Sequence, residues 1–313
     1  FRKIYFTTNY ANTKNWSAFF NKIYWHLKMT IFNRRDLPFS QNMKNFWNTN
    51  GYLIFENFYT NNECDILINK SEKLIKEFDP NSVKSIFDTK KQEEVDDKYF
   101  LESGDKIRFF FEDKAFDKDG NLIKDKKLSI NKIGHALHDL DEDFYNFSHR
   151  KDLEDISKSI NISNPLLLQS MYIFKQPNIG GEVVCHQDST FLYTEPESAI
   201  GFWVALEDAN IENGCLWVAR GGHKGPLRKI FTKINNKMTL KTLNNEPFEK
   251  TSTPLEVKKG TLIILHGRLP HYSCENTSDK SRHAYTLHII DGNCKYPAEN
   301  WLQRDNLPLK GFT

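Results

Sequence analysis

From Ser163 to Asp188 the sequence reads SNPLLLQSMYIFKQPNIGGEVVCHQD, and within this stretch the pattern of the chain changes. Before it, apolar residues recur at helical spacing; after it, short apolar runs alternate with Gly, Pro or Asn breaks. Runs of this length and spacing are typical of a β-sandwich or barrel, with a jelly roll as the leading choice. The runs are Leu166–Phe174, Ile200–Leu206, Cys215–Val218, Leu255–Val257, Thr261–Leu265 and Ala284–Ile290. We therefore expect an α+β fold that is mainly β, with N-terminal and flanking helices.

The first half of the chain predicts the helices and a few strands. Residues 42–46 indicate a short helix that is followed by a strand at 51–55. Residues 61–77 have apolar side chains at helical spacing behind polar starters, which predicts an amphipathic helix. The run KIRFFFE (106–112) is strand-like, and 128–162 has the spacing of a polar helix.

The N-terminal segment differs from the rest. Residues 1–35 carry seven basic and no acidic residues and lack a clear period, so we expect a poorly structured extension. We expect one domain over 36–313, with helical support at 40–162 and the jelly-roll core at 163–313. Residues 1–28 leave two interpretations open. As a transit segment they would indicate a mitochondrial protein; we favour an extension on a cytoplasmic one.

Composition excludes several classes of protein. The chain has 313 residues, with 43 Lys+Arg against 41 Asp+Glu, a formal charge of +2. This balance excludes a general polyanion binder, so we expect no nucleic-acid partner. No apolar run approaches 18 residues, so we expect no membrane span. Five scattered cysteines without a CxxC pair favour free thiols in a reducing compartment. Oligomeric state is left open.

A possible metal site ends the opening stretch. His186 and Asp188 are two residues apart, and on a strand such residues project from one face roughly 7 Å apart. An imidazole and a carboxylate can then converge on one ion. A second histidine from a distant strand would complete the two-histidine, one-carboxylate face that binds non-haem Fe(II) and leaves positions open.

Two histidines, His266 and His271, are candidates for the third ligand. Arg282 follows His271 by 11 residues and opens a strand-like run. A guanidinium at that place suits bidentate binding of a dicarboxylate co-substrate, and Ser273 can add a hydroxyl donor to the same carboxylate. We therefore assign His271 as the ligand and His266 as a structural residue.

Several longer blocks resemble the phytanoyl-CoA dioxygenase family of iron(II)- and 2-oxoglutarate-dependent oxygenases. The similarity runs from about residue 43 to the C-terminus. Blocks of this length, in this order, are far more specific than the short HxD pattern. They are SGDKIRFFFE (103–112), INKIGHALH (130–138), QSMYIFKQP (169–177), HQDSTFLYTEP (186–196), ENGCLW (212–217), SRHAYTLH (281–288) and ENWLQ (299–303).

The resemblance implies a double-stranded β-helix with bound Fe(II), and 2-oxoglutarate as co-substrate. It implies that iron is held by His186, Asp188 and His271. The remaining positions that it implies surround 2-oxoglutarate, and they are Arg282, Ser273, Lys106, Met171 and Trp203. We expect hydroxylation of a small organic or acyl substrate by O2, with release of succinate and CO2 and with ascorbate as a candidate reductant.

Two other functions remain open. A jelly-roll metal hydrolase or isomerase could use the same histidines and carboxylate, although it would not need a dicarboxylate anchor such as Arg282. A non-catalytic protein that binds metal and 2-oxoglutarate could have kept the whole set. Iron-dependent succinate release separates all three.

Overall fold

A sheet of eight strands is the largest element of the computed structural model, which describes residues 30–313 except 84, 87–93, 96 and 313. In sheet order the strands are β1 (Phe32–Asn33), β2 (Tyr52–Glu56), β13 (Leu262–His266), β8 (Ile200–Ala205), β15 (Ala284–Asp291), β6 (Pro165–Ile173), β5 (Ile130–His135) and β4 (Ile107–Phe111). β1 pairs with β2 in parallel, and the other neighbours in this sheet are antiparallel.

Two smaller sheets complete the described strands. A four-stranded antiparallel sheet has the order β12 (Thr253–Leu255), β9 (Leu216–Val218), β14 (His271–Ser273) and β7 (Val183–His186). A three-stranded sheet has the order β10 (Lys229–Ile234), β11 (Lys237–Thr242) and β3 (Glu94–Val95). Antiparallel strands from the second half of the chain form the whole four-stranded sheet and the centre of the eight-stranded sheet. This arrangement confirms the predicted jelly roll.

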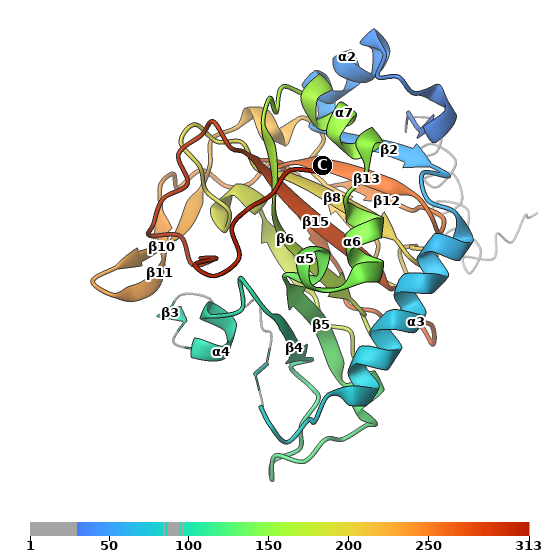
Figure 1. Cartoon of the computed structure of the whole chain (residues 1–313), viewed down its shortest axis with the longest axis vertical. Helices are drawn as coiled ribbons and strands as arrows, with labels where there is room; N and C mark the ends of the chain where they lie inside the picture. The colour runs from blue at the N-terminus through green and yellow to red at the C-terminus, as the bar shows by residue number, and fades with distance from the viewer. Residues whose placement is uncertain (1–29, 84, 87–93, 96, 313) are drawn as a thin grey trace, which may run out of the picture. The chain divides into compact units, whose positions relative to one another are not determined.

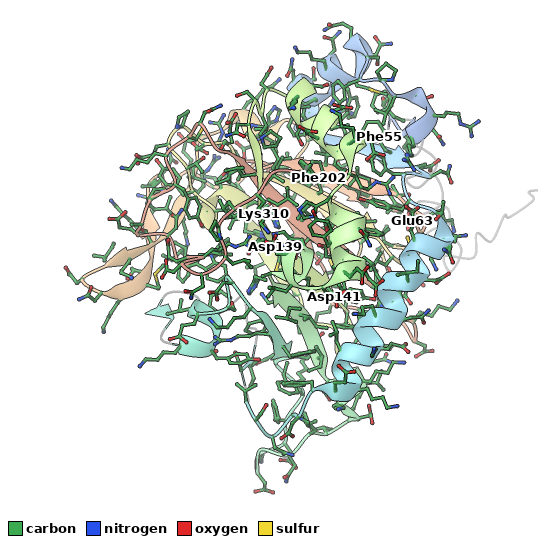
Figure 2. The ribbon with its side chains drawn as sticks, in the orientation of Figure 1. Phe55, Glu63, Asp139, Asp141, Phe202 and Lys310 are labelled. Atoms are coloured by element: carbon green, nitrogen blue, oxygen red, sulfur yellow. The ribbon has the colours of Figure 1, made fainter. Side chains whose placement is uncertain are left out.

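Helices cover one face of the large sheet, as Figure 1 shows for α3, α6 and α7. The α-helices are α2 (Gln41–Asn50), α3 (Asn61–Glu77), α4 (Lys98–Leu101), α5 (Leu137–Leu140), α6 (Glu142–Ser148) and α7 (Lys151–Ser159). Leu67 of α3 and Phe144 of α6 join Tyr285 and Leu287 of β15 in one buried cluster, together with Phe202 (Figure 2). This cluster is the main hydrophobic core.

Strand β15 shows how the sheet separates core from cavity. Tyr285 and Leu287 belong to the core under the helices. The alternate residues Thr286 and His288 line a cavity on the opposite face. Because successive side chains of a strand point to opposite faces, one strand serves both environments.

The first half of the chain follows the predictions except in one segment. The short helix and following strand appear as α2 and β2, the amphipathic helix as α3, and the strand-like run as β4. The helix expected over 128–162 is wrong at its start, where residues 130–135 form β5 between β4 and β6. Five of the six β5 residues are buried, so the strand shows no alternation that sequence could reveal. The segment 40–162 therefore supplies strands of the large sheet as well as helices.

Most of the expected N-terminal extension, residues 1–29, lies outside the described residues. Its last part is ordered: Phe32 of β1 pairs with Phe55 of β2, and Arg34–Asp36 form a 3₁₀ turn. Among the residues that can be described, no helix has both the length and the apolar character to cross a membrane.

The C-terminal segment is fastened across the large sheet. Leu167 N of β6 donates to Lys310 O at 2.8 Å, and Lys310 and Asp139 are labelled in Figure 2. The buried Arg304 guanidinium pairs with Asp139 and donates to Leu168 O at 3.0 Å. This attachment holds Trp301, three residues earlier, at the cavity.

The N-terminus of α3 gives a test of the fold. Thr60 accepts a hydrogen bond from Glu63 N at 3.2 Å, and Glu63 accepts one from Thr60 N at 2.7 Å. Replacing Thr60 with Ala removes the cap and should lower the free energy of unfolding by about 1 kcal/mol in urea denaturation. Replacing the exposed Asn62 with Ala is the control, and it should change stability by less than about 0.5 kcal/mol. Equal effects would contradict a capping role for Thr60.

Candidate active site

Strand pairing brings the two sequence-predicted histidines together. His186 at the end of β7 is the register partner of His271 at the start of β14, and their ring centroids lie 4.3 Å apart. Asp188 begins a 3₁₀ turn directly after β7 instead of continuing the strand. Its carboxylate nevertheless turns back, and the ligand atoms of all three residues lie within 4.8 Å of one another.

Backbone carbonyls orient both imidazoles. The Nδ1 atom of His186 lies 2.9 Å from Val184 O, and that of His271 lies 2.9 Å from Leu269 O. A carbonyl can only accept, so each Nδ1 carries the proton and each Nε2 presents a lone pair. Both Nε2 atoms lie 3.6 Å from Asp188 Oδ1. Burial lowers the pKa of His271 to about 4, which keeps its ring neutral at pH 7.

A third histidine supports the carboxylate from behind. His288 Nε2 lies 3.4 Å from Asp188 Oδ2, and Gln169 Nε2 lies 3.3 Å from His288 Nδ1. Gly201 leaves the room for this contact, because a Cβ there would stand 2.9 Å from Asp188 Oδ2. Sequence reasoning assigned no separate role to His288. No sequence feature marks it, because in a buried strand run a histidine that packs and one that supports a carboxylate look alike.

The donor set fits a divalent transition metal. Two imidazoles and one carboxylate on one side of a point leave coordination positions open, as in non-haem Fe(II) sites. His266, the rejected candidate, lies elsewhere: its Nδ1 accepts from Arg268 N at 3.0 Å, and its ring is 5.1 Å from that of His223.

A buried arginine lies in the same cavity, which has a volume of about 180 Å³. Arg282 is 2% exposed, and its guanidinium carbon lies 5.2 Å from the centre of the Trp203 ring. Its Nε and Nη1 have no hydrogen-bond partner among the described residues. Burial lowers the pKa of Arg282 to about 10, so it is charged at neutral pH. Ser273 and Met171 line the cavity as well.

Lys106 is the one predicted site residue that the structure does not bring to the cavity. Its side chain is 47% exposed, and its ammonium donates to Asp105 Oδ1 at 2.7 Å and to Glu102 O at 3.0 Å. These contacts do not fit the expected role. The lysines that line the cavity are Lys132 and Lys175, both nearly fully buried. Both occur in the quoted blocks INKIGHALH and QSMYIFKQP, and a lysine inside an apolar strand run was the signal that sequence reasoning missed.

Aromatic side chains form one part of the remaining cavity wall. Phe191 lies 6.0 Å from the His186 ring and 5.8 Å from the Phe231 ring. Phe100 and Trp301 stack with their centroids 4.4 Å apart. The cavity therefore combines the metal-ligand cluster, basic side chains and an apolar wall.

Comparison with known proteins identifies the family. Residues 47–284 match the family described as phytanoyl-CoA dioxygenase (PhyH). The chain belongs to the phytanoyl-CoA dioxygenase family. It is similar to a phytanoyl-CoA dioxygenase of Arabidopsis thaliana, with 46% identity over 264 residues that cover 84% of this chain and 93% of that protein. It is also similar to the phytanoyl-CoA dioxygenase domain-containing protein 1 homolog of Dictyostelium discoideum, with 47% identity and coverage of 81% and 92%.

Solved structures share the fold at lower identity. EctD from S. alaskensis, with 2-oxoglutarate and 5-hydroxyectoine, has a TM-score of 0.58 at 18% identity, covering 87% of this chain and 86% of that one. The non-heme alpha ketoglutarate dependent carbocyclase SnoK has a TM-score of 0.58 at 15% identity, with coverage of 86% and 90%. Family membership makes this chain a 2-oxoglutarate-dependent dioxygenase, and the ligand cluster fits the iron that this chemistry uses.

The two neighbouring histidines give a test of the metal site. Replacing His271 with Ala should weaken anaerobic Fe(II) binding beyond the about 10–100-fold that loss of a supporting residue around a metal ligand costs. Replacing His266 with Ala is the matched control, and it should leave Fe(II) affinity close to wild type. The reverse order of the two affinities would show that His266 is the ligand.

Proposed function

We propose that this dioxygenase hydroxylates a C–H bond of a small organic substrate, with Fe(II) held by His186, Asp188 and His271. The proposal is supported by one observation: a single cavity contains both a candidate metal site and a buried arginine. Three convergent ligand atoms lie in it, and so does the buried Arg282, whose Nε and Nη1 lack a hydrogen-bond partner among the described residues. A metal hydrolase would need the first feature but not the second.

Iron bound at this cluster would supply the oxygen-activating chemistry that converts 2-oxoglutarate to succinate and CO2 and oxidises the substrate. The protein contributes geometry. The Val184 and Leu269 carbonyls fix the tautomers of the two histidines, and His288 Nε2 lies 3.4 Å from one carboxylate oxygen of Asp188. Asp188 would supply a carboxylate ligand where a halogenase of this fold leaves the position to halide, which favours hydroxylation.

The polar residues of the cavity are proposed to hold 2-oxoglutarate. Arg282 would form a bidentate pair with the far carboxylate, because its planar fork matches that geometry, and Ser273 would donate to the same group. Trp203 and Met171 would form the walls. Lys132 replaces Lys106 in this proposal, since Lys132 lines the cavity and Lys106 faces outward.

The aromatic wall suggests what the prime substrate carries near the metal. Phe191 contacts the His186 ring, and Phe231, Phe100 and Trp301 continue the apolar surface. We propose that the oxidised carbon belongs to an apolar, ring-bearing or acyl part of the substrate. Ascorbate is proposed as the reductant that keeps iron in the Fe(II) state. The five free cysteines support a reducing, cytoplasmic location.

Succinate formation tests the reaction. Wild-type protein with Fe(II), 2-oxoglutarate and O2 should release succinate even without a prime substrate, at a low rate. Replacing His186 or Asp188 with Ala removes one of three ligands and should abolish this release while circular dichroism shows an intact fold. Turnover at the wild-type rate in either variant would refute the ligand assignment. Metal binding without any succinate would favour a non-catalytic binding protein.

Arg282 tests the co-substrate anchor. Replacing it with Ala leaves a buried carboxylate unpaired, a loss of about 2–5 kcal/mol, or roughly 30-fold to several thousand-fold in 2-oxoglutarate affinity. Replacing it with Lys keeps the charge but not the fork, so it should raise the KM for 2-oxoglutarate more than it changes iron affinity. The exposed Arg35, replaced with Ala, is the control. Titration of 2-oxoglutarate into the anaerobic iron-loaded protein measures the 2-oxoglutarate affinity of all three variants. An unchanged affinity in Arg282→Ala would favour the metal-hydrolase function.

A further inference from the structure

Lys175 lies two residues after the end of β6 and is almost completely buried, at 2% exposure. Its ammonium donates to Ser273 Oγ at 2.8 Å and to Gly181 O at 2.9 Å. Its carbonyl accepts from Asn276 Nδ2 at 2.9 Å and from Arg282 N at 3.3 Å. The residue is therefore fixed at both ends, and its charged group lies beside the hydroxyl proposed to bind 2-oxoglutarate.

The surrounding chain leaves room for this one side chain. Gly214 has a φ of 82°, and a Cβ at that position would overlap Cε of Lys175. Lys175 itself has a φ of 41°, in the left-handed region that few non-glycine residues adopt. Burying a charged lysine costs free energy, and a left-handed backbone adds strain. These costs favour a function for the Lys175 ammonium in the site.

The charges around Lys175 favour binding of an anion. Burial, followed by the charge of Arg282, lowers the pKa of Lys175 to about 7. Glu112, Cys274 and Glu182 act in the opposite direction without restoring the usual value. Two basic groups thus line one buried cavity, and a carboxylate bound there would offset the charge of both.

The hydrogen bond to Ser273 has a directional consequence. A protonated lysine has three donors and no acceptor, so Ser273 Oγ must accept from it. The single hydroxyl proton of Ser273 is then turned toward another acceptor. When Lys175 is neutral it can accept instead, and the hydroxyl proton can point back at the amine.

We propose that Lys175 is a positioning residue for 2-oxoglutarate. Its ammonium makes Ser273 a donor toward the far carboxylate and places a second positive charge beside Arg282. This inference rests on the proposed function, because it requires 2-oxoglutarate at Arg282. The co-substrate should then bind together with a proton, since its carboxylate raises the pKa of the Lys175 ammonium.

The sign of the pH dependence follows. Binding is at full strength below about pH 7, where Lys175 is already charged in the free protein. Above that pH each binding event must take up a proton, so affinity falls by up to about tenfold per pH unit until the pKa of the complex is reached.

Calorimetric titration of 2-oxoglutarate into the anaerobic iron-loaded protein tests this, in buffers of different ionisation enthalpy at pH 7.5 and 8.5. Wild-type protein should take up close to one proton per site at the higher pH. Replacing Lys175 with Met should abolish the uptake and weaken binding about 10–100-fold, the range for a hydrogen bond to a charged group. At saturating 2-oxoglutarate, kcat should change much less than KM. Replacing the exposed Lys151 of α7 with Met is the control, and it should keep both the 2-oxoglutarate affinity and the proton uptake.

The outcomes separate the two hypotheses. If wild-type protein does not bind 2-oxoglutarate, the proposed function fails. If it binds without proton uptake, or if uptake persists in Lys175→Met, the role of Lys175 is refuted. If Lys175→Met does not fold, Lys175→Arg decides: its permanent charge should let 2-oxoglutarate bind without proton uptake, and uptake that persists in that variant overturns the inference.

Discussion

Antiparallel pairing of β7 with β14 places His186 opposite His271, and the site depends on this register. Because side chains alternate along a strand, a slip by one residue would turn one imidazole to the opposite face of the sheet. The register in turn depends on β14 being held on its other side by β9, where His271 pairs with Val218. Pairing of the edge strand β7 with β14 therefore fixes the positions of two ligand atoms more firmly than a flexible loop could.

The large sheet supplies the other half of the cavity by dividing its two faces. One face packs against α3, α6 and α7 and is apolar, and the other presents His288, Gln169 and Trp203 toward the ligand cluster. Apolar burial stabilises the sheet, while the polar face carries side chains that are expensive to bury. The cost of burying these polar groups is offset because the opposite face of the same strands packs in the helix-covered core.

Sequence reasoning predicted much of this arrangement, and its failures have physical causes. The ligand choice of His271 over His266 agrees with the cluster in the structure, because the offset to Arg282 reports strand spacing. The role of Lys106 rested on the resemblance alone, and the structure places this exposed lysine directly before β4, whereas Lys132 of β5 lines the cavity. The strand β5 resembled a helix because it is buried on both faces and so lacks a period of two. His288 was missed because a buried histidine has no sequence mark that separates packing from support of Asp188.

Charge in the cavity links stability to ligand binding. Burial lowers the pKa of Lys132 and of Lys175, so both ammonium groups are costly in the free protein, whereas Arg282 stays charged. Against these basic groups the cavity offers the carboxylate of Asp188, and that carboxylate faces the histidines. A dianionic co-substrate and a divalent cation have complementary charges, so binding one favours binding the other in such a site. Each ligand that binds the native state alone also adds to the free energy of unfolding. The polar face that weakens the free protein is thus the same feature that makes the complex with metal and 2-oxoglutarate the more stable state.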